Sequence, residues 1–307
     1  MKKSFKLLSM ILALCITLTY INVPAYAATE GVAQEAATTG AFIPIDGTEA
    51  ILIDADTGAI IYEQNSLAPV APASTTKILT TLLVIEAIER GELALDTPVT
   101  VTPTAIATIN SLASHVNPRL KAGETFNVLE LLLAVMVKSD CAACNVLGEK
   151  VSGSVNSFVE LMNKRGTELG CVNSHWSEPS GYPADDHFTN AYSLALITRE
   201  ALKHDLFRML ILNKSASLPA TNKTGVRTFE TTNKLLLPGA YYNPYCIGGK
   251  TGTCKAAGEC MVSIGHKDNK TVIAVVLGTK KKTFPGVGKV EMRFFESNRL
   301  LQLGLGY

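Results

Sequence analysis

Strand-like segments lie near both ends of the chain, and helix-like segments fill the region between them. Near the amino end, two apolar runs at 50–54 and 59–62 flank a turn of Asp, Thr and Gly, which is typical of a β-hairpin. Near the carboxyl end, two β-branched runs at 260–265 and 271–277 flank a turn of Asp and Asn. Apolar sheet faces must be covered by other elements. We therefore expect an α+β fold with one antiparallel sheet built from both chain ends, flanking helices and a central helical subdomain.

Six segments carry apolar residues at helical spacing. The first begins after Pro72 and ends before Gly91, and the fourth ends before Gly170, as expected because glycine often follows the last turn of a helix. The expected helices are 77–89, 128–137, 142–151, 154–169, 193–202 and 288–303. No internal repeat is visible, and we expect one domain over residues 41–307.

Composition narrows the class of protein. The chain has 307 residues, which is room for one large domain or two modest ones. Hydrophobic residues make up 47% and charged residues 18%, which excludes a disordered chain and argues for a packed globule. The formal net charge of +1 provides no basic field for nucleic acid, so we expect no such partner.

Residues 1–27 have the three-part layout of a secretory signal peptide. Lysines at positions 2, 3 and 6 precede an apolar run over 7–21, and small residues at 25 and 27 mark a cleavage site before Ala28. The alternative is an uncleaved membrane anchor, although the run is shorter than the roughly 20 residues of a spanning helix. We expect export, a flexible linker over 28–40, and no membrane span once the signal peptide is removed.

Seven cysteines become six when the one at position 15 leaves with the signal peptide. An even number in an exported chain permits disulfides, and six cysteines allow 15 pairings. The local expectation is a bond between Cys254 and Cys260 across a hairpin. Cys141 and Cys144 form a C-x-x-C that fits two buried thiols on a helix better than a zinc or redox site, because no second Cys/His pair has ligand spacing.

Ser74 and Lys77 form a Ser-x-x-Lys motif at the start of the first expected helix. Three residues are about one turn, so both side chains share one face. A serine needs an adjacent base to act as a nucleophile, and a lysine can be that base if burial or neighbouring cations lower its pKa. Taken alone the motif is weak, because a serine that caps the helix explains it more simply.

Two further motifs carry related chemistry. Ser139, in the sequence Lys-Ser-Asp-Cys at 138–141, lies in a short break between two expected helices, where its hydroxyl can project into a cleft and relay a proton. A Lys-Thr-Gly-Thr sequence at 250–253 offers a cation, a hydroxyl and close backbone on an edge strand, which suits a substrate carboxylate and an oxyanion. A second Lys-Thr-Gly at 223–225 lies in polar, turn-prone surroundings and is the less favoured copy.

In this order the three motifs match the signature of penicillin-binding proteins and class A β-lactamases. From about residue 41 to 307 the chain resembles the serine D-Ala-D-Ala carboxypeptidases, the low-molecular-mass penicillin-binding proteins. Other segments share this resemblance. They are the opening hairpin at 52–58, the helix at 158–170, Gly181-Tyr182-Pro183 followed by Asp185-Asp186-His187, and Thr231 to Leu236.

The resemblance implies a role for each matching residue. Ser74 would form an acyl-enzyme with the penultimate D-Ala, Lys77 would be its general base, and Ser139 would relay the proton to the leaving D-Ala. The terminal carboxylate would be held by Lys250 and Thr251, and backbone N–H groups of Ser74 and Thr253 would form the oxyanion hole. The expected substrate-binding residues are Lys250, Thr251, Gly252, Thr253 and Cys141.

The resemblance also implies the function. An exported enzyme of this family would remove the terminal D-Ala from peptidoglycan pentapeptides ending in D-Ala-D-Ala, and would act in cell-wall synthesis and remodelling. Its location would be the cell wall or the periplasm. Inhibition by β-lactam antibiotics would follow from acylation of the same serine. No metal and no organic cofactor is implied.

Two residues depart from the family pattern. Cys141 stands where the carboxamide of an Asn usually hydrogen-bonds the substrate. A thiol is a weak donor, so the loss of that hydrogen bond would cost about 1–3 kcal/mol. A bond from Cys141 to Cys254 would compete with the Cys254–Cys260 pairing. Glu178 replaces another usual Asn and faintly resembles the deacylating Glu of class A β-lactamases. The alternatives are therefore a class A-like β-lactamase, or a catalytically weak peptidoglycan-binding relative disabled at Cys141.

Overall fold

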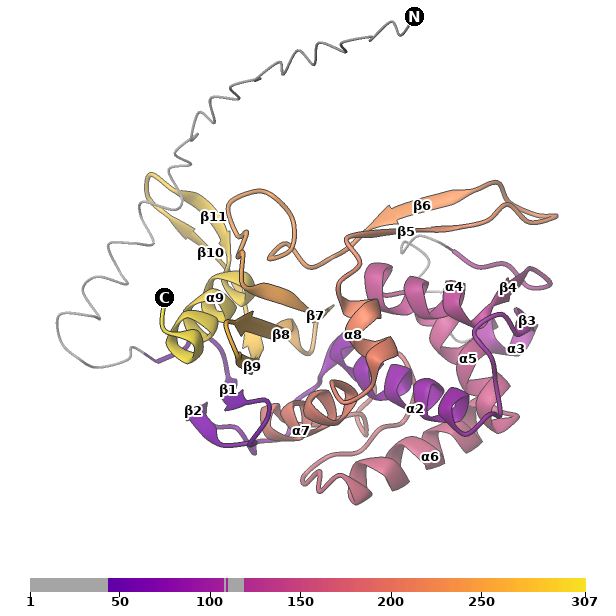
Figure 1. Ribbon diagram of the computed structural model, residues 1–307, viewed down its shortest axis with the longest axis horizontal. Coiled ribbons are helices and arrows are strands. Elements are labelled where there is room, and N and C mark those ends of the chain that lie inside the picture. Colours follow the sequence, from indigo (N-terminus) through magenta and orange to yellow (C-terminus); the bar gives the residue numbers. More distant parts are fainter. Residues whose placement is uncertain (1–43, 108, 110–118) are drawn as a thin grey trace, which may run out of the picture.

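The computed structural model describes residues 44–107, 109 and 119–307 (Figure 1). The expected signal peptide over 1–27 and linker over 28–40 lie outside these residues. Within the described part of the chain, no helix has both the length and the apolar character needed to cross a bilayer.

Strands from both ends of the chain form one antiparallel sheet of five strands, with the order β2-β1-β9-β8-β7 (Figure 1). The strands are β1 (Glu49–Asp54), β2 (Ile60–Gln64), β7 (Cys246–Cys254), β8 (Gly258–Lys267) and β9 (Lys270–Thr279). The amino-terminal β1 pairs with the carboxyl-terminal β9 along its whole length, with Glu49 opposite Leu277 and Asp54 opposite Val272. This arrangement confirms the predicted α+β fold, and it places β7 at an edge of the sheet.

The inner strands are apolar on both faces because helices cover both faces. In β1, Ala50 and Leu52 belong to the core under helix α9 (Met292–Leu305). Ile51 and Ile53 point the other way, into the larger core. Alternate residues of a strand face opposite sides, so a strand buried on both faces has a continuous apolar run rather than an alternating one.

Helices fill the middle of the chain, as predicted. The larger core contains residues from α2, α5, α6, α7 and α8 together with one face of the sheet. The helical elements before α9 are a 3₁₀ turn η1 (Ala73–Thr76), α2 (Lys77–Glu89), α3 (Pro103–Ala107), α4 (Val128–Leu133), a π-helical turn η2 (Ala134–Lys138), α5 (Cys141–Ser152), α6 (Val155–Glu168), α7 (Ala191–Ala201) and α8 (Asp205–Ile211).

Two helix predictions need correction. The segment 128–137 is not one α-helix, because its second half is the π-helical turn η2. The segment 288–303 is helical only from Met292 onward, since β11 (Gly288–Glu291) pairs with β10 (Lys281–Phe284) in a hairpin.

Two other small hairpins were not predicted from the sequence. They are β3 (Pro98–Thr100) with β4 (Thr125–Asn127), and β5 (Ser215–Leu218) with β6 (Arg227–Glu230). Their strands have three or four residues, too few for a pattern to show.

All six cysteines of the described chain are free thiols. The expected Cys254–Cys260 disulfide is therefore not formed, and neither is the alternative bond from Cys141 to Cys254. In the β7–β8 ladder, Cys254 is opposite Gly258 and Cys260 is opposite Gly252, so the two cysteines are not directly paired across the strands.

Candidate active site

Ser74 lies in the 3₁₀ turn that leads directly into α2, and Lys77 is the first residue of that helix. One turn separates them, and the Lys77 Nζ donates to the Ser74 Oγ over 3.0 Å. The preceding Ala73 has φ of +48°, a left-handed conformation that is uncommon for a residue with a side chain. Such backbone strain is typical of functional sites.

Glycines bring two other segments close to Ser74. A Cβ on Gly181, which has φ of +83°, would lie 1.8 Å from the carbonyl oxygen of Ala73. A Cβ on Gly252 would lie 3.1 Å from the backbone nitrogen of Ser74. The loop at 181 and the strand β7 therefore contact the Ser74 turn through bare backbone, which is the use of glycine at close approaches.

Lys77 is fully buried and makes two further contacts. Its Nζ donates to the carbonyl oxygen of Ser180 over 2.5 Å and lies 3.4 Å from the Sγ of Cys141. Burial by itself lowers the pKa of Lys77, but negative charge on Cys141, on Cys144 and on Glu178 raises it, and the balance lies above the usual value. Burial raises the pKa of Cys144 far beyond the usual range, so that sulfur stays neutral.

Ser139 follows the π-helical turn and adopts a left-handed conformation, with φ of +68°. Single-turn π-helices are frequent at functional sites, and this one turns the chain so that Ser139 leaves the helix. The next residue, Asp140, caps α5 by accepting from the backbone N–H of Ala143 over 2.7 Å. Burial raises the pKa of this Asp140 carboxyl to about 6.

Lys250 reaches Ser139 from β7, and its Nζ donates to the Ser139 Oγ over 2.9 Å. Lys250 is 1% exposed. Its pKa lies well below the usual value, chiefly because burial penalises the charge and because Lys77 lies nearby. The site thus contains two serine–lysine pairs, and both lysines are held in low-dielectric surroundings.

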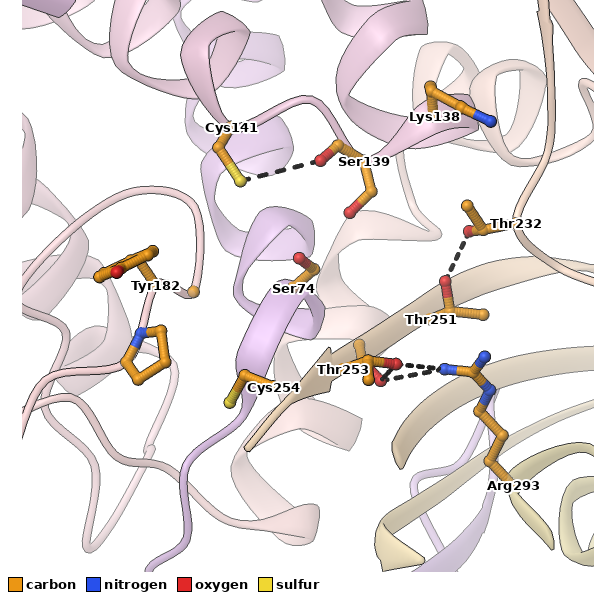
Figure 2. Close-up of a pocket in the computed structure, with 13 residues that line it drawn as sticks. Ser74, Lys138, Ser139, Cys141, Tyr182, Thr232, Thr251, Thr253, Cys254 and Arg293 are labelled. Atoms are coloured by element: carbon orange, nitrogen blue, oxygen red, sulfur yellow. Dashed lines mark hydrogen bonds between the residues drawn. The ribbon is translucent and has the colours of Figure 1, made fainter. Parts of the chain in front are cut away.

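Thirteen residues line one cavity of about 420 Å³ at the meeting point of these segments (Figure 2). They are Ser74, Lys138, Ser139, Cys141, Gly181, Tyr182, Pro183, Thr232, Thr251, Gly252, Thr253, Cys254 and Arg293. Six of the eight predicted site residues are among them, and the other two, Lys77 and Lys250, contact Ser74 and Ser139 from buried positions. The structure therefore brings all eight together.

The two walls of the cavity differ in character. Figure 2 shows Thr251, Thr253 and Arg293 on one side of Ser74, and Tyr182 on the other. The hydroxyls of Thr232 and Thr251 lie 2.5 Å apart. Arg293 donates from its Nη1 to the Thr253 Oγ1 over 2.6 Å. One wall is thus rich in hydroxyls and carries a guanidinium, which suits an anionic group.

Sequence reasoning missed Arg293 and Thr232. Arg293 lies in the first turn of α9, far from all three motifs, and a lone arginine beside a hairpin gives no spacing signal. Thr232 lies in the segment 231–236 that carried part of the family resemblance, but its hydroxyl was given no role. Its proximity to Thr251 depends on how that loop crosses the edge strand β7.

Glu178 does not line the cavity. Its carboxylate accepts from the backbone N–H groups of Ser180, Gly181 and Tyr182, and from the Ser180 hydroxyl. The loop fixed in this way presents the Ser180 carbonyl to Lys77 and the Pro179 carbonyl to a hydroxyl of α2. Glu178 therefore shapes the loop behind Lys77.

The second Lys-Thr-Gly copy has structural contacts. Lys223 donates to the carbonyl oxygen of Ala122, and the Glu124 carboxylate accepts from Thr221 over 2.6 Å and from Arg227 over 3.0 Å. None of these residues lines the cavity beside Ser74. This copy anchors the β5–β6 connection to the neighbouring 119–124 segment, in agreement with its lower ranking in the sequence.

One group of three potential metal ligands occurs in the described residues, namely Glu86, Glu200 and His204, with one ligand atom of each within 4.8 Å of the others. Arg165 pairs with Glu86 over 2.8 Å and with Glu200 over 3.2 Å, and Lys203 pairs with Glu200 over 2.5 Å. These ion pairs use the carboxylates internally. None of the residues lines the cavity beside Ser74.

Comparisons with curated proteins agree on one family. A model described as D-alanyl-D-alanine carboxypeptidase, peptidase S11, matches residues 33–281. The chain is 32% identical over 233 residues to the D-alanyl-D-alanine carboxypeptidase DacF of Bacillus subtilis, covering 76% of this chain and 57% of DacF. It is 32% identical over 264 residues to DacC of Escherichia coli, covering 86% of this chain and 62% of DacC. It therefore spans about three fifths of the length of these relatives.

Solved structures agree on the fold. A serine-to-alanine mutant of a Streptomyces DD-transpeptidase superposes with a TM-score of 0.75 at 25% identity, covering 87% of this chain and all of that one. A peptidoglycan synthesis regulatory factor from Streptococcus pneumoniae gives 0.74 at 30% identity, covering 85% of this chain and 71% of that one. With the family model matching most of the chain, we conclude that this protein belongs to the peptidase S11 family of D-alanyl-D-alanine carboxypeptidases.

Proposed function

We propose that this protein is a serine D-alanyl-D-alanine carboxypeptidase that removes the terminal D-Ala from peptidoglycan stem peptides. The observation that carries the proposal is the pair of serine–lysine contacts at one cavity, Ser74 with Lys77 over 3.0 Å and Ser139 with Lys250 over 2.9 Å. Hydrolysis through an acyl-enzyme needs a base for the nucleophile and a proton source for the leaving amine. Lys77 supplies the base, and the Ser139 hydroxyl, held by Lys250, supplies the path by which the proton reaches the leaving amine.

Acylation begins when the neutral amine of Lys77 takes the proton of the Ser74 hydroxyl. The Ser74 oxygen then attacks the carbonyl carbon of the penultimate D-Ala. The backbone N–H groups of Ser74 and Thr253 stabilise the oxyanion, since preorganised donors act most strongly where charge develops. The proton that Lys77 took passes through the Ser139 hydroxyl to the leaving amine, the peptide bond breaks, and D-Ala departs. Water then attacks the ester as it gives a proton to the neutral Lys77, and return of that proton to the Ser74 oxygen regenerates Ser74.

The hydroxyl-rich wall binds the terminal carboxylate of the substrate. Thr251 and Thr232 offer hydroxyl donors, and Arg293 offers a guanidinium that is fixed beside Thr253. Charge-assisted hydrogen bonds are about twice as strong as neutral ones. The opposite wall, with Tyr182 and Pro183, accepts the less polar part of the stem peptide. This asymmetry orients the peptide across Ser74 with its carboxyl end toward β7.

The wider function follows from this reaction. Residues 41–307 form the catalytic domain, and the protein acts outside the cytoplasm, where peptidoglycan is found, in wall synthesis and remodelling. β-Lactam antibiotics acylate Ser74 as substrate mimics. The expected signal peptide supplies the export route. The proposed chemistry uses side chains and backbone of this chain alone.

The rival function as a class A-like β-lactamase requires a carboxylate that activates water beside the acyl group. Glu178 was its candidate, but its oxygens are bonded within the loop behind Lys77 and it does not line the cavity. A weak peptidoglycan-binding relative is favoured only by the thiol of Cys141. Since both serine–lysine pairs are intact, we prefer the active enzyme.

Intact-mass spectrometry of the purified protein with benzylpenicillin tests the proposal. A lasting adduct on the wild type, absent from Ser74→Ala, is expected, together with D-Ala release from a peptide ending in D-Ala-D-Ala. Rapid loss of the adduct and of penicillin would favour the β-lactamase, and no adduct with a folded wild type would favour the binding protein. Circular dichroism of Ser74→Ala establishes that its fold is intact.

A further inference from the structure

Arg293 lines the cavity and also forms an ion pair with Glu291 outside it. It lies in the first turn of α9 and its side chain is 12% exposed. Its Nη1 donates to the Thr253 Oγ1 over 2.6 Å and to the Gly252 carbonyl over 3.2 Å. Among the residues that line the cavity, only Arg293 and Lys138 are charged, and both are cations. The cavity is therefore suited to an anionic group.

Glu291 lies directly behind this guanidinium, at the junction of β11 and α9. Its Oε2 accepts from the Arg293 Nη2 over 3.0 Å, its other oxygen pairs with Lys234, and Lys281 lies 3.8 Å away. Its backbone N–H donates to the hydroxyl of Tyr241 over 2.8 Å. Three cations thus surround this carboxylate, and the Tyr241 bond holds its backbone.

The charge of Glu291 is maintained by the same contacts. Burial raises the pKa of its carboxyl, but the bonds from Lys234 and Arg293 outweigh burial and lower the pKa below the usual value. The group is ionised at neutral pH. Glu291 itself does not line the cavity, so it acts on a ligand only through Arg293.

We infer that Glu291 is a positioning residue, which holds the Arg293 guanidinium against Thr253 and thereby makes the site selective for peptides with a free terminal carboxylate. This inference rests on the proposed function. Without the carboxylate, Arg293, Lys234 and Lys281 would repel one another, and the Nη2 edge of Arg293 would lose its partner. A long, flexible arginine would then leave its position beside Thr253.

The test compares two substrates on the full chain, an N-acetylated peptide ending in D-Ala-D-Ala and the same peptide with a C-terminal amide. Glu291→Gln should raise the KM for the free acid about tenfold while kcat stays within about threefold, and should leave the KM for the amide unchanged. Glu291→Asp should restore part of the loss. Glu296→Gln is the matched control, because Glu296 is a buried carboxylate on the neighbouring helix α9 that pairs with Arg299 over 2.6 Å and does not line the cavity.

Equal losses on the two substrates would mean that Glu291 is merely structural, and an unchanged KM for the free acid would mean that Arg293 needs no anchor. Either result overturns the inference while leaving the proposed function intact. If the wild type releases no D-Ala, the proposed function fails by itself. The anchor is then judged by the acylation of Ser74 by benzylpenicillin and by its methyl ester, where Glu291→Gln should slow only the free acid.

Discussion

The side-chain nitrogen of Lys77 lies 3.4 Å from the sulfur of Cys141 and 3.0 Å from the hydroxyl of Ser74. An ammonium beside a thiolate is a stable pair, but it cannot accept the proton of Ser74. A neutral amine beside a thiol can accept it. Negative charge on the sulfur favours the protonated amine, so Cys141 opposes the neutral form of Lys77 that the reaction needs.

Replacing Cys141 by Asn should preserve or raise activity. The carboxamide removes the first of the negative charges that raise the pKa of Lys77 and leaves Glu178 in place, so the pKa of Lys77 should fall. The base must be neutral, so a lower pKa extends activity to lower pH. We expect benzylpenicillin acylation equal to the wild type or up to about tenfold faster, with its acid limb shifted to lower pH. The rate constant measured from pH 5 to pH 9 checks this.

Cys141→Ala separates charge from hydrogen bonding in that experiment. It removes the ionisable sulfur but supplies no carboxamide, so it should shift the acid limb as Cys141→Asn does without the gain in rate. Loss of acylation in a folded Cys141→Asn variant would show that the thiol has a positive role, contrary to this account.

Glu178→Gln should weaken the fold more than the chemistry. Gln keeps one acceptor oxygen for the backbone N–H groups of the loop but loses the second, which costs about 1–2 kcal/mol of unfolding free energy. The lifetime of the penicilloyl adduct should change less than about threefold. Thermal unfolding and time-resolved intact mass measure the two effects. A lifetime extended by two orders of magnitude would instead assign the deacylating base to Glu178.

The two Lys-Thr-Gly copies predict opposite responses to the same substitution. A Cβ on Gly252 would lie 3.0 Å from the Pro72 carbonyl and 3.1 Å from the Ser74 nitrogen, whereas a Cβ on Gly225 meets nothing within 4 Å. Gly252→Ala should therefore displace the nucleophile turn and slow acylation at least about tenfold. Gly225→Ala should match the wild type. Equal rates for both variants would mean that β7 does not position Ser74.

Glu49 should make stability fall as pH rises. Its side chain is 1% exposed, one oxygen accepts only from the Ala191 N–H and the other has no hydrogen-bond partner. Burial, opposed by the Ala191 bond, raises the pKa of this carboxyl from 4.5 to about 8. Between those values the folded state holds a proton that the unfolded chain has released, so unfolding free energy declines across that range and levels off above pH 8.

Glu49→Gln stays uncharged at every pH and should remove this decline. The unfolding free energy of the variant relative to the wild type should therefore be higher at pH 8 than at pH 5, by on the order of 2–4 kcal/mol. Urea unfolding of both proteins at the two pH values measures it, and the other titrating groups cancel in the comparison. Identical pH dependence of the two proteins would show that Glu49 is ionised in the folded state.

The long elements were predictable because their patterns are strong and local. Lys77–Glu89 was predicted to the residue, since a glycine follows its end and buried residues run through it. The strands β8 and β9 follow from β-branched runs around an Asp-Asn turn. The small hairpins were not predictable, because three or four residues carry no period. The π-helical turn is invisible as well, since its apolar residues continue the helical spacing of α4.

The site residues also fall into those that a local motif predicts and those that depend on tertiary packing. Ser74, Lys77, Ser139 and Lys250 were recognised because short motifs hold chemically related residues at fixed spacing. Arg293 depends on the packing of α9 against the sheet, which no local pattern records. The Cys254–Cys260 disulfide failed for a geometric reason, since each cysteine is opposite a glycine rather than the other cysteine. The role of Glu178 depended on the direction of its carboxylate, which residue type alone does not specify.

The pairing of β1 with β9 joins the two ends of the chain in one sheet, so the site is complete only when both ends are present. Ser74 and Lys77 are made early in the chain, whereas Lys250 and the strands that hold it come near the end, and β7 joins the sheet only through β8. During synthesis from the amino end, the segment with Ser74 is therefore present long before Lys250 and the strands that complete the site. Activity therefore begins only after the last strands have closed, and contacts this distant in sequence make closure slow. The sheet topology therefore makes the complete site depend on the carboxyl-terminal strands.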